Sequence, residues 1–440
     1  MSANTTSGRS ILQHARETVG PSEGIPIGLG DSAAIDAFNR LRVSEPAGLF
    51  DTQLQYDTSP IFWESAFTGT AAAVTHLPDE SAARLTVGAS DTVTRQSRAY
   101  HRYQPGKSQL IMMTFVLSPP SLGVDQRVGY FDDENGLFLA IDSADALPYI
   151  ILRSFTSGTA VDTPIAQADW NLDTLDGSGG DGNPSGITLD ITQSQILIID
   201  LEWLGVGRSR IGFVIDGLIV YCHEFLRANS IGAPYMTTAN LPLRYQIGAG
   251  AGVTGTYSMR QICSMVSSEG GFDTERGIPM SIVPTGTTSI TARRPILSIR
   301  PQTTFNAITN RGTIIPEGYT IFTDDQDVFY EIIYGGFLSG AAFVPVNGTF
   351  SQAEYDASAS SISGGFAIES GIVEAGTGPG ANQGPGSIQS ALLSKLPMAL
   401  DANGDHPAGP ILTDNLTVVV ASIPGTATDT AAALNWRELR

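Results

Sequence analysis

Basic residues and cysteine are scarce in this sequence of 440 residues. Lysine and arginine total 24 against 44 aspartates and glutamates, which gives a formal net charge of −20. Because nucleic-acid affinity comes mainly from basic side chains that neutralise phosphates, this balance argues against binding of DNA or RNA. The two cysteines, Cys222 and Cys263, exclude a disulfide-dense scaffold. Buried free thiols are expected, and a disulfide between the two remains an open alternative.

Apolar runs long enough to cross a membrane are also missing. The longest mostly apolar stretches, such as Leu110–Leu117, fall far short of the roughly 20 residues that a membrane-spanning helix needs. The first ten residues, MSANTTSGRS, contain no apolar core of a secretion signal. We therefore expect a soluble chain that is made in the cytoplasm and binds no membrane.

Short motifs that carry chemistry are absent as well. The sequence holds no nucleophile elbow, phosphate loop, HExxH pair or dinucleotide fingerprint. The five histidines are dispersed, so they do not complete a zinc site with the two cysteines. We expect no catalytic residues, no cofactor and no metal, and hence a protein that is not an enzyme.

What the sequence does contain is a sustained β pattern. The 48 glycines and 25 prolines are scattered, as many tight turns between short strands require. Gln195–Leu204 alternates apolar and polar residues with a period of two, which predicts a half-buried strand. In Ile211–Phe225, the pair Asp216-Gly217 is a favoured type I′ turn between apolar flanks, which predicts a hairpin.

Further strand candidates follow at short intervals, while long amphipathic helical patterns are absent. They lie at Gln109–Leu117, Arg127–Phe131, Leu137–Ile141, Tyr149–Phe155, Leu243–Ile247, Ser258–Val266, Ile296–Arg300, Tyr319–Thr323, Val328–Tyr334, Ala367–Val373, Leu412–Ala421 and Ala432–Leu439. This spacing predicts an all-β fold with two β-sandwich or jelly-roll-like domains. We divide the chain into an extended N-terminal arm at 1–35, a first sandwich at 36–271, a connector with some β character at 272–294 and a C-terminal sandwich at 295–440.

The N-terminal arm is polar and rich in glycine, serine, threonine and proline. This composition fits a disordered terminus, and it equally fits an arm that orders on a neighbouring subunit. The sparse apolar residues that would anchor such an arm are Ile11, Leu12, Ile25, Ile27 and Leu29.

Acidic residues gather in two glycine-containing loops. They are Asp169, Asp173, Asp176 and Asp181 in the first loop, and Asp401 and Asp405, with the amide Asn403 between them, in the second. Oxygen ligands on such loops can hold Ca²⁺. The first spacing does not fit the EF-hand template, so a solvated acidic loop is favoured there, and a tight turn is favoured in the second.

Two hypotheses about glycans depend on particular side chains. Asp200 and Glu202 lie two apart on one strand face, and paired carboxylates can hydrolyse a glycosidic bond when held about 5 to 9.5 Å apart. A solvent-facing strand would show the same pattern without any function. Sugar binding needs an exposed aromatic beside acidic or amide groups, and Trp170 with Asn171 and Asp173 is the candidate.

Several segments together resemble a family of structural proteins from the particles of tailed phages. They are DAFNRLRVSEP at 36–46, YQPGK at 103–107, QRVGYF at 126–131, ENGL at 134–137, AQADWN at 166–171, EWLGVG at 202–207, GFVIDG at 212–217, YMTTANLPLR at 235–244, SIRPQTTFNAITNR at 298–311 and NWREL at 435–439. The resemblance covers about residues 35–440. The GFVIDG hairpin and the strand pattern also look like a concanavalin-like, lectin-type jelly roll, at the level of fold alone.

The resemblance implies a component of the virion, assembled in the cytoplasm of a bacterial host, without catalytic residues. Its implied partners are other copies of itself in a ring or layer, and other neck or tail proteins of the particle. Decoration of the collar or neck and a sheath-like layer on the tail both fit. A module that binds a host-surface glycan is the alternative function, and a glycan depolymerase is the third.

Overall fold

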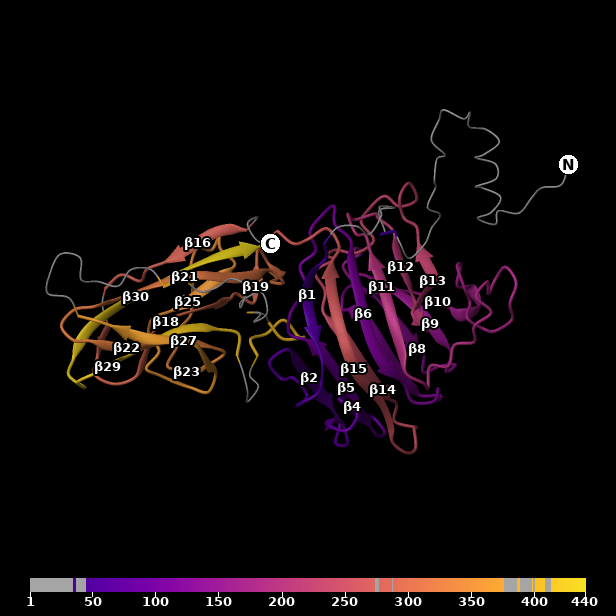
Figure 1. Ribbon diagram of the computed structural model, residues 1–440, viewed down its shortest axis with the longest axis horizontal. Helices are drawn as coiled ribbons and strands as arrows, with labels where there is room; N and C mark the ends of the chain where they lie inside the picture. The colour runs from indigo at the N-terminus through magenta and orange to yellow at the C-terminus, as the bar shows by residue number, and fades with distance from the viewer. Residues whose placement is uncertain are drawn as a thin grey trace, which may run out of the picture.

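The computed structural model describes residues 35–36, 45–273, 277–286, 288–375, 386–387, 398, 400–407 and 413–440. The chain forms two β-rich domains that lie side by side along the long axis of the molecule (Figure 1). The C-terminal Arg440 returns to the border between them, where its guanidinium lies over the ring of Phe305. In the part of the chain so described, no helix is both long and apolar enough for a membrane span.

The first domain is a sandwich of two antiparallel sheets. One sheet has the strand order β13-β12-β11-β6-β15-β4-β3, with β1 paired to β15, and the other has the order β10-β9-β8-β7-β14-β5-β2. The strands of the first sheet are β1 Ala47–Thr52, β3 Ala73–Leu77, β4 Ala82–Val87, β6 Gln109–Val116, β11 Gln195–Leu201, β12 Ser209–Ile215, β13 Leu218–Phe225 and β15 Tyr257–Ser268. Those of the second are β2 Trp63–Thr68, β5 Thr92–Ser97, β7 Val124–Phe131, β8 Gly136–Ile141, β9 Pro148–Ser154, β10 Val161–Ala166 and β14 Leu243–Ala249.

The core of this sandwich follows from the period-two pattern of its strands. In β6, Ile111, Met113 and Phe115 are fully buried, and the residues between them are only partly buried. Their side chains meet those of the opposite sheet, including Val128 and Tyr245, in one large apolar cluster. Burial of each such side chain contributes about 1.5–3 kcal/mol, which is why the alternating strands close face to face.

The second domain also contains two main sheets. One has the order β16-β30-β21-β28, with β17 paired to β30, and the other has the order β24-β25-β18-β29-β22-β27. The strands of the first are β16 Ile278–Ile282, β17 Thr288–Ile290, β21 Thr313–Thr323, β28 Gly386–Ser387 and β30 Thr428–Leu439. Those of the second are β18 Arg294–Pro301, β22 Val328–Tyr334, β24 Val344–Pro345, β25 Ala353–Asp356, β27 Phe366–Val373 and β29 Leu416–Ser422. Two short hairpins complete it, β19 Thr304–Phe305 with β20 Ile308–Thr309, and β23 Phe337–Ser339 with β26 Ser361–Ser363.

The sequence-based expectation of an all-β fold with two sandwich-like domains is confirmed. The predicted hairpin is present: Ile215 pairs with Leu218, and Asp216 and Gly217 have φ of 50° and 80°, as a type I′ turn requires. The segment expected to be a connector is more than a linker. Residues 278–282 and 288–290 pair with β30 and so extend a sheet of the second domain.

The predicted N-terminal arm overlaps the first domain at its last residue, Ile35. The anchors Ile11, Leu12, Ile25, Ile27 and Leu29 lie outside the described residues. Ile35, the last residue assigned to the arm, is buried, and its carbonyl accepts a hydrogen bond of 2.9 Å from the Arg210 guanidinium. The fold of the first domain therefore takes up at least the end of the predicted arm.

Candidate functional site

The residues expected to bind a glycan do not form an exposed surface. Trp170 follows the 3₁₀ turn Gln167–Asp169, is buried in the core of the first domain, and donates its indole N–H to the carbonyl of Ile165. The Asn171 amide is fixed to the backbone of Glu224 on β13 by two hydrogen bonds, of 3.0 and 2.9 Å. Asp173 is also buried. Sugar binding at this position would need an exposed aromatic ring, but the indole of Trp170 is packed in the apolar core.

Asp173 instead organises its own loop. Its carboxylate accepts hydrogen bonds from the backbone of Leu175 and Ser185 and from the side chain of Asn183. This use of both oxygens explains why the acidic loop does not gather its carboxylates around one point. Within the described residues, no three His, Cys, Asp or Glu side chains lie together in a way that could hold a metal ion.

The expectation that Asp200 faces solvent beside Glu202 is wrong. Asp200 is fully buried on β11, where it pairs with the guanidinium of Arg210 and accepts a hydrogen bond from the Tyr221 hydroxyl. The Arg210 guanidinium lies 4.2 Å from the centre of the Tyr221 ring. Glu202 lies just beyond the end of β11, where it accepts a 3.4 Å hydrogen bond from the backbone of Arg208. Burial in an ion pair removes Asp200 from reach of a substrate.

The two cysteines are free thiols. Cys222 is buried in the core of the first domain, and Cys263 is exposed on β15. Burial raises the pKa of the Cys222 thiol well above its ordinary value. This thiol therefore behaves as a small apolar side chain of the core, as expected for a free cysteine.

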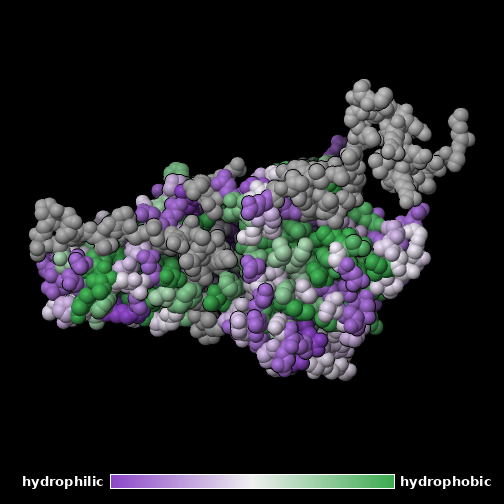
Figure 2. All heavy atoms as spheres, viewed as in Figure 1, coloured by the Kyte–Doolittle hydropathy of each residue, from purple (hydrophilic) through white to green (hydrophobic). Residues whose placement is uncertain are grey.

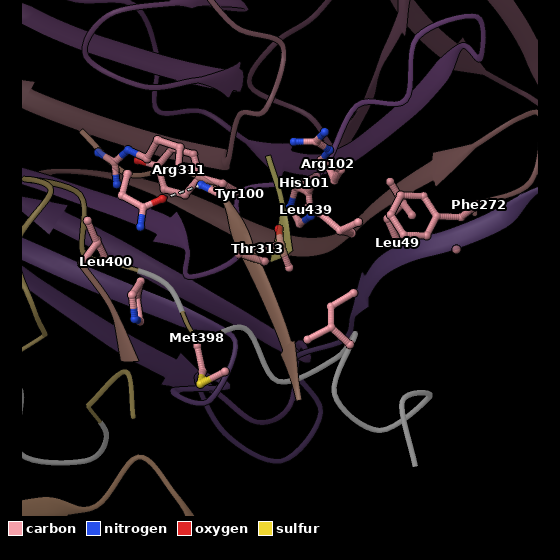
Figure 3. A pocket seen from close by; sticks show the side chains of 16 residues that line it. Leu49, Tyr100, His101, Arg102, Phe272, Arg311, Thr313, Met398, Leu400 and Leu439 are labelled. Atoms are coloured by element: carbon pink, nitrogen blue, oxygen red, sulfur yellow. Dashed lines mark hydrogen bonds between the residues drawn. The ribbon is translucent and has the colours of Figure 1, made fainter. Parts of the chain in front are cut away.

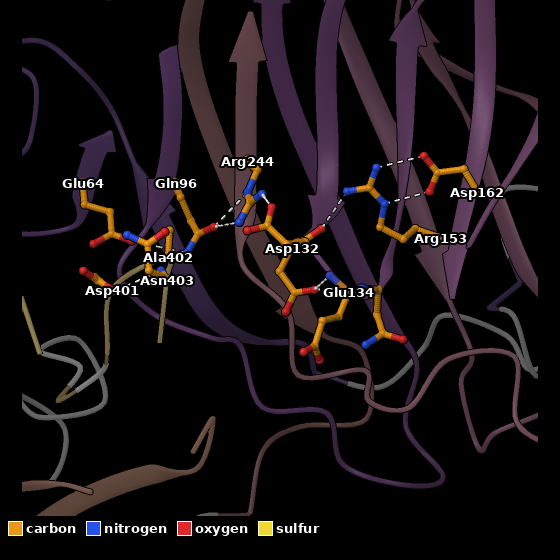
Figure 4. A network of polar contacts seen from close by, with 12 residues as sticks. Glu64, Gln96, Asp132, Glu134, Arg153, Asp162, Arg244, Asp401, Ala402 and Asn403 are labelled. Atoms are coloured by element: carbon orange, nitrogen blue, oxygen red, sulfur yellow. Dashed lines mark hydrogen bonds and ion pairs between the residues drawn. The ribbon is translucent and has the colours of Figure 1, made fainter. Parts of the chain in front are cut away.

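A network of polar side chains covers the outer face of the second sheet of the first domain (Figure 4). The buried Arg244 of β14 donates to the Gln96 carbonyl oxygen at 2.8 and 2.5 Å and pairs with Asp133 at 2.5 Å. Arg153 of β9 forms a bidentate salt bridge with Asp162, with N–O distances of 2.7 and 2.8 Å. Bidentate ion pairs of this kind fix the geometry of both side chains more firmly than single hydrogen bonds do.

Aromatic rings lie beneath these arginines. Phe131 and Phe138 stack with ring centres 4.2 Å apart, and both rings are fully buried. The guanidinium groups of Arg244 and Arg153 lie 5.3 and 5.2 Å from the centres of the Phe131 and Phe138 rings. The arginines thus cover an apolar surface that would otherwise be open on this face.

The second domain reaches the same face through the loop that starts at Asp401. Glu64 on β2 accepts a hydrogen bond of 3.3 Å from the Gln96 amide and another from the backbone of Ala402. Burial raises the pKa of the Glu64 carboxyl to about 7, with Arg98 opposing the shift and Asp401 adding to it (Figure 4). A carboxyl of the first domain is therefore in contact with a loop of the second.

Arg311 is the second link between the domains. Its guanidinium lies 4.1 Å from the centre of the Tyr100 ring and donates a 3.0 Å hydrogen bond to the carbonyl of Asp401. Beside it is a hollow of about 230 Å³, lined by Leu49, Phe272 and Leu439 among others (Figure 3). We call the contacts of Glu64, Tyr100, Arg311 and the 401–403 loop the domain junction.

Sequence reasoning missed the domain junction, although a signal was present. Asn135, Arg244 and Arg311 belong to the segments ENGL, YMTTANLPLR and SIRPQTTFNAITNR, which carry the resemblance to phage proteins. Those segments lie more than 50 residues apart in the chain and come together only in the fold. The contacts between these segments could not be predicted from the spacing of their residues in the sequence, because the contacts are long-range.

No protein-family model matches the sequence, and no curated protein matches it at a significant level. Among solved structures, the chain is similar to a glycoside hydrolase family 16 endo-glucanase from Bacteroides ovatus, at 10% sequence identity and a TM-score of 0.34, covering 50% of this chain and 99% of that one. It is also similar to a legume lectin-like domain from Entamoeba histolytica, at 10% identity and a TM-score of 0.29, covering 50% of this chain and 96% of that one. No residue role is carried over from either.

Proposed function

We propose that this chain is a non-enzymatic structural protein of a tailed-phage particle, present in multiple copies on the collar, neck or tail. The observation that supports this proposal is the place of the phage-like segments in the fold. Arg244 and Arg311 come from two of these segments. The guanidinium of Arg311, in the second domain, lies over the Tyr100 ring of the first, and Arg244 pairs with Asp133 in the wall of the first domain that faces the second. A segment that contributes to the contact between two domains suits a structural protein, whose shape determines how it packs in an assembly.

The surface of the second domain also suits an assembly. Phe329 of β22 and Ile372 of β27 are direct cross-strand partners, and their side chains are 50% and 52% exposed. Paired apolar side chains at the edge of a sheet gain free energy when another surface covers them. Hydrophobic side chains gather over both domains on the face shown in Figure 2. We expect some of this surface to be buried between neighbouring copies, through heterologous contacts that close into a ring or continue as a layer.

Analysis of purified particles tests this proposal. Particles of the phage that encodes the chain are banded in a density gradient, and their proteins are quantified by mass spectrometry. The chain should co-sediment with the particles in several copies each, and a labelled nanobody should mark the collar, neck or tail in cryo-electron micrographs. Presence of the chain in the lysate but not in the banded particles would contradict the proposal.

The absence of enzymatic activity is tested separately. Purified protein is incubated with capsular polysaccharide or lipopolysaccharide of the host, and the length of the chains is followed by size-exclusion chromatography. We expect no shortening, because the buried Asp200 pairs with Arg210 and cannot serve as a catalytic carboxylate. Shortening that is lost in the Glu202→Gln variant would support the depolymerase alternative instead.

A further inference from the structure

A large hollow of the described structure lies between the two domains. It is a cleft of about 890 Å³, which falls within the range of about 300–1,000 Å³ typical of small-molecule sites. One wall comes from the turn between β7 and β8 and from the loop before β14, both in the first domain. The other wall is the β19–β20 hairpin of the second domain.

The first wall is held rigid by one buried amide. Asn135 donates a 2.8 Å hydrogen bond to the Thr237 hydroxyl and accepts hydrogen bonds from the backbone of Thr237 and Phe155, at 2.9 and 3.3 Å. Asp132 accepts the backbone N–H groups of Glu134 and Asn135, at 2.9 and 2.8 Å, and so fixes the turn itself. Three segments that lie apart in the sequence are therefore set in place before any ligand arrives.

The second wall is a strained hairpin. Asn306 and Ala307 at its tip have φ of 51° and 62°, in the left-handed region that an alanine rarely occupies. Phe305, which precedes them, is covered by the Arg440 guanidinium at 4.7 Å, and Ile308, which follows them, is 72% exposed. Strain of this kind concentrates at sites of ligand contact, where the surrounding structure maintains it.

The groups that line the cleft select the chemistry of a ligand. Carboxylates of the β7–β8 turn and the guanidinium groups of Arg311 and Arg440 line the same space, so a ligand with a strong charge of either sign meets repulsion there. The remaining lining combines the phenyl rings of Phe155 and Phe305 with amides such as Asn306 and hydroxyls such as Thr238. Rings contact the C–H faces of a ligand, while amides and carboxylates bind hydroxyl groups.

We propose that this cleft binds a neutral oligosaccharide, with Phe305 as the contact for a sugar ring and Glu134 as an acceptor for its hydroxyls. The proposal does not depend on a place in the virion, and a structural protein with this cleft would also contact the cell surface or a glycan on its own particle. A neutral sugar is favoured over a basic peptide because Arg311 and Arg440 lie on the wall opposite the acidic turn.

A panel of neutral di- to hexasaccharides of glucose, galactose, mannose and N-acetylglucosamine, printed as an array, tests the proposal, and the best binder is titrated by calorimetry. We expect Phe305→Ala and Glu134→Gln each to weaken binding at least tenfold. Phe67→Ala, which removes an exposed ring of β2 that does not line the cleft, is the matched control and should bind like the parent. Thermal unfolding of each variant confirms that it is folded.

Three results would overturn the proposal. They are absence of binding to any neutral saccharide of the panel, equal loss of binding in Phe67→Ala, and preference for a peptide of residues 1–20 of this chain over every sugar. Incorporation of Phe305→Ala into particles is scored in parallel. A variant that loses the sugar but still enters the particle separates the cleft from the structural role.

Discussion

Several ionisable side chains of this protein stabilise the fold through ion pairs and hydrogen bonds in partly or fully buried positions. Glu64 and His406 lie at contacts that need a particular state of charge. Asp200 is held by Arg210, and His406 lies between Asp414 at 2.6 Å and Glu354 at 3.3 Å. Removing one partner of a buried pair leaves an uncompensated charge, which costs several kcal/mol. Glu64 and His406, whose pKa values are shifted in the fold, make folding stability depend on pH.

Glu64→Gln should stabilise the protein at alkaline pH. The pKa of Glu64 is raised from 4.5 to about 7 in the fold, so its favourable contribution is complete below pH 4.5 and is lost as pH rises through 7. Glutamine imitates the protonated form at every pH. The difference in unfolding free energy should be near zero at pH 4 and reach on the order of 1–3 kcal/mol at pH 8, since one pKa unit corresponds to about 1.4 kcal/mol. Urea unfolding across this pH range measures it, and a pH-independent difference would contradict the assignment.

His406→Gln should have the opposite effect, a loss of stability below neutral pH. Burial lowers the pKa of His406, but hydrogen bonds to Asp414 and Glu354 outweigh burial and raise it from 6.5 to about 9. The contribution of the imidazolium is therefore complete below pH 6.5 and disappears as pH rises through 9. We expect the variant to be destabilised by about 1–3 kcal/mol at pH 6 and to match the parent above pH 10. His76→Gln, on the first domain, is the control.

At the scale of secondary-structure elements, two hairpins differ in whether their turn residues favour the backbone conformation that they adopt. The β12–β13 hairpin turns through Asp216-Gly217, whose residues accept positive φ easily. The β19–β20 hairpin has the same two-residue form but turns through Asn306-Ala307. An alanine at φ of 62° has no local reason to adopt this backbone, so contacts around the hairpin must hold it there.

Ala307→Gly should raise the stability of the second domain by about 0.5–1 kcal/mol, because glycine removes the Cβ that opposes a positive φ. The comparison is Ala367→Gly on the exposed face of strand β27, where glycine should lower stability by a similar amount. Chemical denaturation followed by the fluorescence of Trp436, which is buried in the second domain, reports both changes. A loss of stability in Ala307→Gly would show that the hairpin is not strained.

At the scale of the whole molecule, the two domains are joined by more than a linker. Ile61, from the first domain, packs against the apolar core of the second, and Arg311 of the second lies on Tyr100 of the first. Gln104 exchanges two hydrogen bonds with the backbone of Asp273, at 2.6 and 3.0 Å, where the chain leaves the first domain. These contacts lead us to expect a fixed angle between the domains.

Arg311→Ala should loosen this connection. It removes the cation–π contact with Tyr100, which crosses between the domains and is worth about 0.5–2 kcal/mol, and a charged hydrogen bond worth about 1.5–3 kcal/mol that holds the Asp401 loop of the second domain. Calorimetry should resolve two unfolding transitions where the parent shows one, and small-angle scattering should show a wider range of shapes. Arg293→Ala is the control, since its pair with Glu331 is exposed and contributes less than about 1 kcal/mol.

Deletion of residues 1–30 should change the melting temperature little and impair entry into virions. The deletion ends before Ile35, whose burial and contact with Arg210 are kept. Unfolding is followed by calorimetry, and incorporation is measured by complementation of a phage that lacks the gene. Normal incorporation would identify the arm as a terminus without a role, and failure to fold would place it in a domain core.

The sequence by itself determined the all-β class, the position of most strands from Gln109 onward and the β12–β13 hairpin, because period-two burial and turn residues are local signals. Tertiary structure alone decided the rest. Asp200 was expected to be exposed because it lies on the polar face of strand β11. The period-two pattern is the same whether water covers this face or, as in the fold, Arg210 and Ile35 do. Trp170 was the candidate surface aromatic because it neighbours Asn171 and Asp173 in the sequence, and only the packing of the core shows that it is buried. The domain junction and the cleft join residues as far apart as 134 and 305, and such contacts depend on how two domains pack, which no local pattern records.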